Sequence, residues 1–392
     1  MPSSDMELGI GERHSRPVLW WGTYPPAGLG TPEGLGEGVW RSVDGPPEQA
    51  LVLPAPSFLV AHPDLPLLYA VTEADPSIVH VLDVSRPQAP VVAGSIVTGG
   101  SAGCHLLLSP DAGTLYVSHY VSGDLAVVQL TANGLFAADA PSQMLGHAGS
   151  GARRDRQESA HAHSAGYAPG GKHVLVADLG TDELRRYRLE AGGALVEDGI
   201  AATLPPGAGP RHFAVRGNLI YVVCELDHQL RTLRWDSASA SADVVAQVAS
   251  TNAPHRTGDE VSDGHIAIVG DPTLGGDSSL GEIALVSVRG ADVISVFDLS
   301  PEGEARYRGC FDAGFWPRYF AVIGTDLWVG AERGHEVRRF RLADVLALPP
   351  ESGVGEIADL PHDAFPVTSP ACVVASSVSP NSAGTWDRGH SR

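Results

Sequence analysis

The feature that most constrains the fold is a β-rich unit that recurs along the 392 residues. Its seven copies begin with LWWGTY at 19, LYAVTE at 68, LYVSHY at 115, VLVADLG at 174, IYVVCEL at 220, ALVSVRG at 284 and LWVGAERG at 327. Successive copies are 49, 47, 59, 46, 64 and 43 residues apart. This spacing suits about four strands per unit, as in the blade of a β-propeller.

A second, shorter apolar segment precedes every copy except the first. These segments are PSFLVAHP at 56, CHLLLSP at 104, AHSAGYAP at 162, RHFAVRG at 211, HIAIVGD at 265 and RYFAVIG at 318. A seventh, ACVVAS at 371, has no copy of the main unit after it. The C-terminal segment is therefore predicted to enter the N-terminal blade and close the ring, which removes exposed sheet edges.

The sequence thus predicts an all-β fold with a single seven-bladed β-propeller over residues 18–377. Residues 1–17 and 378–392 are predicted to be flexible tails. The two longest intervals hold Gly/Ser/Asp-rich insertions, residues 133–158 and roughly 237–282, which are predicted to form surface loops.

Composition limits the cellular compartment and the partners that are expected for such a propeller. No 18-residue apolar run is present, and the N-terminus lacks the pattern of a secretory signal. Four scattered cysteines without a CxxC motif favour buried thiols in a reducing compartment, so the protein is predicted to be cytoplasmic. The formal charge of −20 argues against nucleic acid or an anionic membrane as a partner. A monomer or a weak homo-oligomer is expected.

The propeller topology predicts one mouth of the central channel. In antiparallel blades the short segments begin where the main runs end, so residues at these two positions share one end of the ring. At or near the beginnings lie His161, His163, Arg211, His265 and Arg318. At the ends of the main runs lie Glu73, Asp178, Glu225, Arg289 and Glu332. His161 and His163, two residues apart on a strand, are expected to share a face.

The motifs GTY at 22–24, QESAHAHS, GAGPRHFAV, YVVCEL, VSVRG and WPRYFAV, in this order, resemble the seven-bladed propeller lactonase family. That family includes 6-phosphogluconolactonases and carboxymuconate cyclases. The resemblance covers Val18 to about Val374 and implies a catalytic cluster with a His of HAH, His163 or else His161. The other members of this implied cluster are Arg211 of GPRH, Glu225 of CEL and Arg289 of SVRG. Cys224 and Val288 stand where the family usually has Asn.

The implied activity is hydrolysis of a sugar lactone, foremost 6-phospho-D-glucono-1,5-lactone, in the pentose phosphate pathway. Such a reaction needs an activated water, a donor for the oxyanion and a cationic clamp for the anionic group. A histidine suits the base, and arginine suits the clamp. Further candidates for substrate binding are Arg318, Glu73, Asp178, Glu332 and His105. No covalent nucleophile is required, and no G-x-S-x-G motif is present.

Other interpretations compete with each of these assignments. The histidines could be structural, and Arg211 and the recurring glutamates could staple neighbouring blades together. A zinc site lacks a third ligand at short spacing, and a calcium site at the channel mouth is a weaker alternative, so no metal and no cofactor are predicted. A carboxymuconate cycloisomerase, or a propeller that only binds a metabolite or a protein, stays an alternative to the lactonase.

Overall fold

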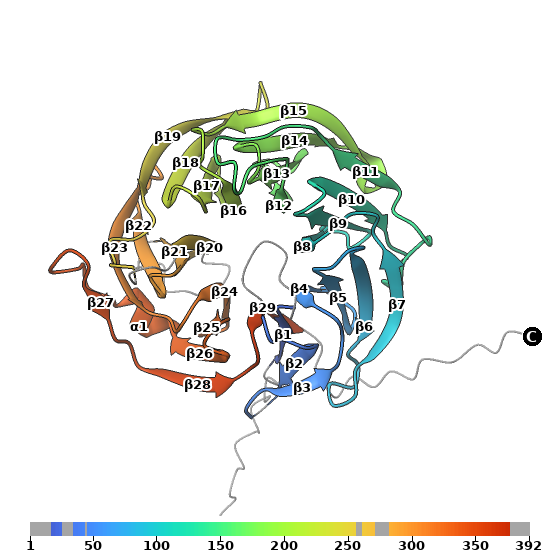
Figure 1. The fold of residues 1–392 in the computed structure, drawn as a ribbon, viewed down its shortest axis with the longest axis horizontal. Helices are drawn as coiled ribbons and strands as arrows, with labels where there is room; N and C mark the ends of the chain where they lie inside the picture. Colours follow the sequence, from blue (N-terminus) through green and yellow to red (C-terminus); the bar gives the residue numbers. More distant parts are fainter. Residues whose placement is uncertain (1–16, 26–33, 44, 256–260, 271–281, 377–392) are drawn as a thin grey trace, which may run out of the picture.

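The computed structural model is a ring of seven β-sheets around a central axis (Figure 1). It describes residues 17–25, 34–43, 45–255, 261–270 and 282–376. The two predicted tails lie almost wholly outside these ranges. Among the described residues, no helix is long and apolar enough to cross a bilayer.

Blades one to four each contain four antiparallel strands, which follow one another from the channel outwards. Blade one consists of β29 (Pro370–Ser376), β1 (Val18–Thr23), β2 (Val39–Ser42) and β3 (Glu48–Leu51). Blade two consists of β4 (Pro56–Ala61), β5 (Leu67–Thr72), β6 (Ile78–Asp83) and β7 (Val91–Val97). Blade three consists of β8 (Gly103–Leu108), β9 (Thr114–His119), β10 (Asp124–Gln129) and β11 (Gln143–Gly146). Blade four consists of β12 (Ala162–Tyr167), β13 (His173–Asp178), β14 (Glu183–Leu189) and β15 (Leu195–Thr203).

The remaining three blades follow the same plan. Blade five consists of β16 (Pro210–Arg216), β17 (Leu219–Cys224), β18 (Gln229–Asp236) and β19 (Ser241–Ala249). Blade six consists of β20 (Ser262–Val269), β21 (Ile283–Arg289), β22 (Val293–Leu299) and β23 (Ala305–Asp312), with β27 (Ile357–Ala358) added in parallel at its edge. Blade seven consists of β24 (Pro317–Ile323), β25 (Asp326–Ala331), β26 (Glu336–Arg341) and β28 (His362–Pro366). The short helices are η1 (Ala191–Gly193) and α1 (Leu342–Leu346).

The C-terminal strand closes the ring as predicted. β29 pairs with β1 along the whole strand, from Val18 opposite Ser376 to Thr23 opposite Pro370. The predicted inner segments and main runs form the first and second strands of all seven blades.

Second strands are apolar on both faces because each lies between two neighbouring blades. All six residues of β17, LIYVVC, are buried, and the same holds for β1, β5 and β9. Outer strands such as β19 are largely exposed instead. The closing blade packs against its neighbour through Trp21 and Trp328, whose ring centroids lie 5.8 Å apart.

The prediction that the two insertions are surface loops is wrong in part. Residues 133–158 contain β11, the outer strand of blade three. The region 237–282 contains β19 and β20, although residues 256–260 and 271–281 of it lie outside the described residues. An outer strand is polar on its solvent face, so its composition resembles that of a loop.

Candidate active site

Every innermost strand carries a β-bulge near its beginning, and these bulges build the wall of the channel mouth. In blade five, Pro210 pairs with Cys224 and His212 with Val223, so Arg211 has no partner in the ladder. The register breaks in the same way in five other blades, and in blade six two residues, Gly264 and His265, lie opposite Ser287. A bulge turns its extra residue out of the regular alternation of the strand. The extra residues in six blades are Ser57, Cys104, His163, Arg211, Arg318 and Ala371.

These side chains meet residues at the ends of the second strands and form one small chamber. Its lining consists of Tyr24, Glu73, Cys104, Tyr120, Arg156, His163, Arg211, Glu225, Arg289 and Arg318. Of the predicted site residues, the structure therefore brings together Glu73, His163, Arg211, Glu225, Arg289 and Arg318. Ser57, His212, Tyr319 and Ala371 line a small recess that continues from the same arginines.

Glu225 is the electrostatic centre of the chamber. Its Oε2 lies 2.8 Å from Nε of Arg211 and 2.9 Å from Nη2 of Arg289. Its Oε1 accepts a hydrogen bond of 2.7 Å from Nη2 of Arg156. Burial alone would raise the pKa of Glu225, but the guanidinium groups hold it well below its usual range. One carboxylate thus faces three cations, and a net positive charge remains for an anion.

His163 contributes a neutral imidazole to the wall. Its Nδ1 is buried and has no hydrogen-bond partner among the described residues. Burial and the nearby Arg211 lower the pKa of His163 well below its ordinary value of 6.5. The ring is therefore unprotonated at pH 7 and can accept a proton.

The expectation that His161 shares a face with His163 is wrong. β12 begins only at Ala162, and the bulge at His163 breaks the two-residue alternation. The ring of His161 stacks on Tyr120 at 4.5 Å between centroids, and its Nδ1 lies 2.7 Å from the backbone oxygen of Tyr120. His161 is not among the residues that line the chamber.

A second ion-pair group lies on the opposite side of the ring, in blades one, two and seven. Nη1 of Arg318 donates to Glu332 at 3.2 Å, and its Nη2 lies 3.7 Å from Glu73. The guanidinium also lies over the ring of Tyr24, 4.1 Å from the centroid. Burial raises the pKa of Glu73 against the opposing effect of Arg318. Glu332 is not among the residues that line the chamber, but it pairs with Arg318, which is.

Two further predicted residues, Asp178 and His105, make contacts that stabilise the fold and do not line the chamber. Asp178 is fully buried, and its Oδ1 accepts hydrogen bonds from the backbone of His161, Gly180 and Thr181 at 2.9, 2.9 and 3.0 Å. It therefore holds the turn after β13. His105 packs on Phe58 at 4.5 Å between centroids and lies outside the lining of the chamber.

Arg156 is one of four chamber residues that sequence reasoning missed; the others are Tyr24, Cys104 and Tyr120. Arg156 belongs to the insertion predicted to be a surface loop, yet its side chain reaches both Glu225 and the hydroxyl of Tyr120. Gln157, which is buried, ties this insertion to blade four through Leu179 at 2.9 Å and Asp182 at 2.7 Å. The sequence signal that could have identified Arg156 is the basic run ARRDR at 152–156, which is unusual in a chain of net charge −20.

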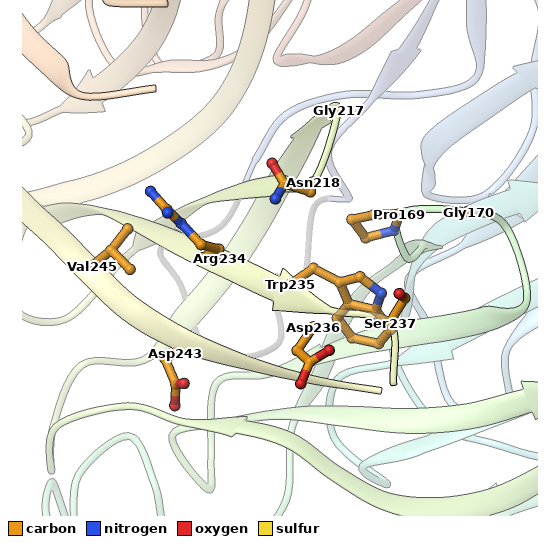
Figure 2. Close-up of a pocket in the computed structure, with 10 residues that line it drawn as sticks. All are labelled: Pro169, Gly170, Gly217, Asn218, Arg234, Trp235, Asp236, Ser237, Asp243 and Val245. Atoms are coloured by element: carbon orange, nitrogen blue, oxygen red, sulfur yellow. The ribbon is translucent and has the colours of Figure 1, made fainter. Parts of the chain in front are cut away.

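A larger pocket lies away from this chemistry. It measures about 520 Å³ and surrounds Trp235, Arg234 and Asp236 beside the turn at Gly217 and Asn218 (Figure 2). That turn joins β16 to β17 at the end opposite the channel mouth. The pocket has no histidine in its lining, so the small chamber is the stronger candidate. No group of three or more His, Cys, Asp or Glu in the described part of the chain could hold a metal ion.

Comparisons with known proteins agree on one family. The family model described as "Lactonase, 7-bladed beta-propeller" matches residues 44–374. A 6-phosphogluconolactonase of Bacillus subtilis is 26% identical over 287 residues, which cover 71% of this chain and 77% of that protein. A probable 6-phosphogluconolactonase of Arthroderma benhamiae is 35% identical over 92 residues, 22% of this chain and 23% of that protein.

Solved structures show the same architecture. A putative 6-phosphogluconolactonase from Bacteroides fragilis superposes with a TM-score of 0.73 at 21% identity, over 94% of this chain and 99% of that chain. The periplasmic gluconolactonase of Pseudomonas aeruginosa gives a TM-score of 0.72 at 22% identity, over 93% and 99% of the two chains. At these identities the likeness is one of fold.

Proposed function

The chain belongs to the seven-bladed β-propeller lactonase family, and we propose that it hydrolyses a sugar lactone with an anionic substituent, foremost 6-phospho-D-glucono-1,5-lactone. The observation that carries this proposal is the neutral His163, whose buried Nδ1 has no partner in the described part of the chain, in one chamber with four arginines. A base and a set of cations are the two things that hydrolysis of such a lactone requires. The similarity to a 6-phosphogluconolactonase of Bacillus subtilis supports the choice of lactone.

In the proposed mechanism, His163 activates a water molecule. The open space of the chamber, about 20 Å³, suits one water. As the water oxygen attacks the carbonyl carbon, His163 takes its proton and a tetrahedral oxyanion forms. The bond between the carbonyl carbon and the ring oxygen then breaks, and the imidazolium returns the proton to the departing alkoxide. The product is the open-chain hydroxy acid, and no proton is gained or lost in the cycle.

Arg211 is the proposed donor to the oxyanion. It extends from the bulge of β16, lines the chamber beside His163, and donates to the backbone oxygen of Gly264 at 2.6 Å. Burial and the neighbouring Arg289 lower the pKa of Arg211 to about 9, which leaves it charged at pH 7. A fixed cation in a small, buried site stabilises developing negative charge strongly.

Arg289 is better suited to position Glu225 than to clamp the substrate. Its Nε donates to the Ser262 backbone oxygen at 3.0 Å. Its Nη2 donates to Ser262 Oγ, to the Asp263 backbone oxygen and to Glu225 at 2.7, 2.8 and 2.9 Å. These contacts use the donors on two of its three nitrogens. We therefore assign to Arg289 the role of holding Glu225, which in turn orients Arg211.

A cycloisomerase acting on a carboxymuconate is the second candidate. It is favoured by the same pairing of a neutral base with clustered arginines, because lactone formation from a polycarboxylate also moves one proton beside several negative charges. A propeller that only binds a protein is less well supported, because the candidate site is an enclosed chamber with surplus positive charge.

The test is a substrate panel with purified protein. Freshly generated 6-phosphogluconolactone, gluconolactone and a carboxymuconate are assayed side by side, with spontaneous hydrolysis subtracted. We expect the phosphorylated lactone to have the highest kcat/KM. Turnover of the carboxymuconate alone would transfer the assignment to the cycloisomerase, and absence of turnover in all three would contradict both enzymes.

A further inference from the structure

The chamber is too small for a whole sugar lactone, so part of a bound lactone must lie in the space beside it. The open volume of about 20 Å³ holds one water, whereas pockets for small molecules usually measure about 300–1,000 Å³. A neighbouring pocket of about 400 Å³ falls in that range. Glu225 contributes to the walls of both, so this side pocket adjoins the proposed reaction centre.

The side pocket lies at the channel mouth between blades five and six. Leu226 and His228 come from the turn that follows β17, Gln229 begins β18, and Ala291 comes from the turn that follows β21. Both turns are at the ends of second strands, as Glu225 and Arg289 are. The pocket is thus placed to receive the part of a substrate that extends from the chamber.

The lining combines an apolar wall with a polar edge. Leu226 and Val261 belong to the apolar wall, and Arg153, His228, Gln229 and Thr251 supply polar groups. The Glu225 carboxylate in the same wall is already paired with three guanidinium groups, so Arg153 is left as the cation for a small negatively charged group on a carbon skeleton.

Arg153 is held in place by the same insertion that brings Arg156 to the chamber. The backbone oxygen of Arg153 accepts hydrogen bonds from Arg156 at 3.0 Å and Gln157 at 2.6 Å. The side chain of Gln157 accepts from the Arg153 backbone N–H at 2.9 Å. One anchored turn therefore presents Arg156 to the chamber and Arg153 to the side pocket.

One contact of Arg153, its ion pair with Asp155, is one that an anionic ligand can replace. Arg153 pairs with Asp155 at 3.0 Å, and their side chains are 41% and 64% exposed. An exposed ion pair of this kind contributes little stability. A phosphate, with more oxygens and more charge than a carboxylate, competes well for a guanidinium.

We propose that the side pocket holds the non-reacting anionic end of the substrate, and that Arg153 selects a phosphorylated over an unphosphorylated lactone. This proposal rests on the proposed lactonase function and names the group that the substrate carries. The reacting carbonyl is at the chamber, beside His163 and Arg211, while the phosphate extends towards Arg153.

The experiment is calorimetric titration of 6-phosphogluconate and of gluconate into the full-length protein. Wild type is compared with Arg153→Ala, with Arg153→Lys, and with Arg154→Ala as a matched control. Arg154 is the adjacent arginine and is exposed, but it lines neither cavity. We expect wild type to prefer the phosphorylated ligand, and Arg153→Ala to weaken its binding about tenfold or more while gluconate binding is unchanged. Arg153→Lys should retain part of the preference, and Arg154→Ala all of it.

Two results would overturn the inference: equal affinity of wild type for the two ligands, or an undiminished preference in Arg153→Ala. Failure of the lactonase proposal is distinguishable, because this titration needs no turnover. A protein inactive on lactones whose phosphate preference depends on Arg153 would keep the anion site and lose only the assigned reaction.

Discussion

At the scale of single residues, the central feature is that His163 is unprotonated at neutral pH. Burial and the positive charge of Arg211 disfavour the imidazolium, so the pKa lies well below 6.5. A base is active in its deprotonated form, and kcat/KM falls only when the pH drops through the pKa of the free enzyme. We therefore predict that kcat/KM is flat from pH 8 to below 6.5 and decreases at lower pH.

The measurement is a pH–rate profile of wild type and His161→Ala, with spontaneous hydrolysis subtracted at each pH. His161→Ala should keep the shape of the profile, because His161 contacts Tyr120 and lies outside the chamber lining. A midpoint at or above pH 6.5 in wild type would contradict a buried neutral base. The profile must be read where the protein is still folded.

Glu225 should matter to stability as well as to activity. Glu225→Gln leaves Arg156, Arg211 and Arg289 close together without their shared carboxylate. Removing one partner of a buried ion pair typically costs about 3–5 kcal/mol. We predict a loss of that order in the free energy of unfolding, measured with urea. Glu302→Gln, at an exposed turn, is the control and should change little; equal stability of the two variants would contradict the network.

Site residues could be predicted where they occupy equivalent positions of the repeat, and could not be predicted where they lie at a bulge or in a connection between strands. Arg211, Glu225 and Arg289 could be placed at the mouth because strand ends in equivalent repeats share one end of the ring. The separation of His163 from His161 depends on a bulge, which a pattern of alternate residues does not reveal. Arg156 comes from a connection between strands, whose course the repeat does not determine. Tyr120 directly follows β9, as Glu225 follows β17, so the repeat could have placed it at the mouth.

At the scale of elements, β29 should be essential for the fold. Its Ala371, Cys372 and Val373 are 3% exposed or less, and it supplies the innermost strand of blade one. We predict that truncation before Ser369 strongly lowers Tm or abolishes cooperative unfolding. Truncation after Ser376, which keeps β29, is the control and should melt like the full chain. Equal melting of both truncated proteins would contradict the role of the closing strand.

The arrangement of strands was predicted more completely than their outer edges. First and second strands carry the apolar repeat, because they are buried between blades, and all seven pairs were recognised. β11 and β19 were assigned to loops because only one face of an outer strand is buried, which leaves a weak pattern.

At the scale of the whole molecule, four neutral histidines around the channel make the fold sensitive to acid. Burial lowers the pKa of His163, His212 and His265 well below 6.5 and that of His105 to about 3. Below pH 6.5 the unfolded chain binds protons at these sites and the folded chain does not. Each such proton lowers the free energy of unfolding by about 1.4 kcal/mol per pH unit.

Carboxyl groups modify this dependence without reversing it. Burial raises the pKa of Glu73 and of Asp263, so protons that these groups hold in the folded protein oppose the effect of the histidines. The lowered pKa of Glu225 adds a further loss of stability below about pH 4.5. We predict that the urea midpoint decreases steadily from pH 7 to pH 5, and a constant midpoint over this range would show that the histidines titrate normally.

Several expectations about location, association and cofactors stay predictions. These are the cytoplasmic location, the monomeric or weakly associating state, and the independence from a metal or another cofactor. A chelator should therefore leave activity unchanged, and inhibition by a chelator would revive a metal site at the mouth.

The central claim is that the chamber around His163 hydrolyses a lactone, and one rate comparison tests it directly. The initial rate on fresh 6-phosphogluconolactone at pH 7 is measured for wild type and for His163→Ala, with folding of both verified by melting and the spontaneous rate subtracted. A general base contributes about 100- to 10,000-fold. The account predicts that wild type exceeds the spontaneous rate and that His163→Ala loses kcat within that range while it remains folded. A folded His163→Ala protein with the wild-type rate would contradict it.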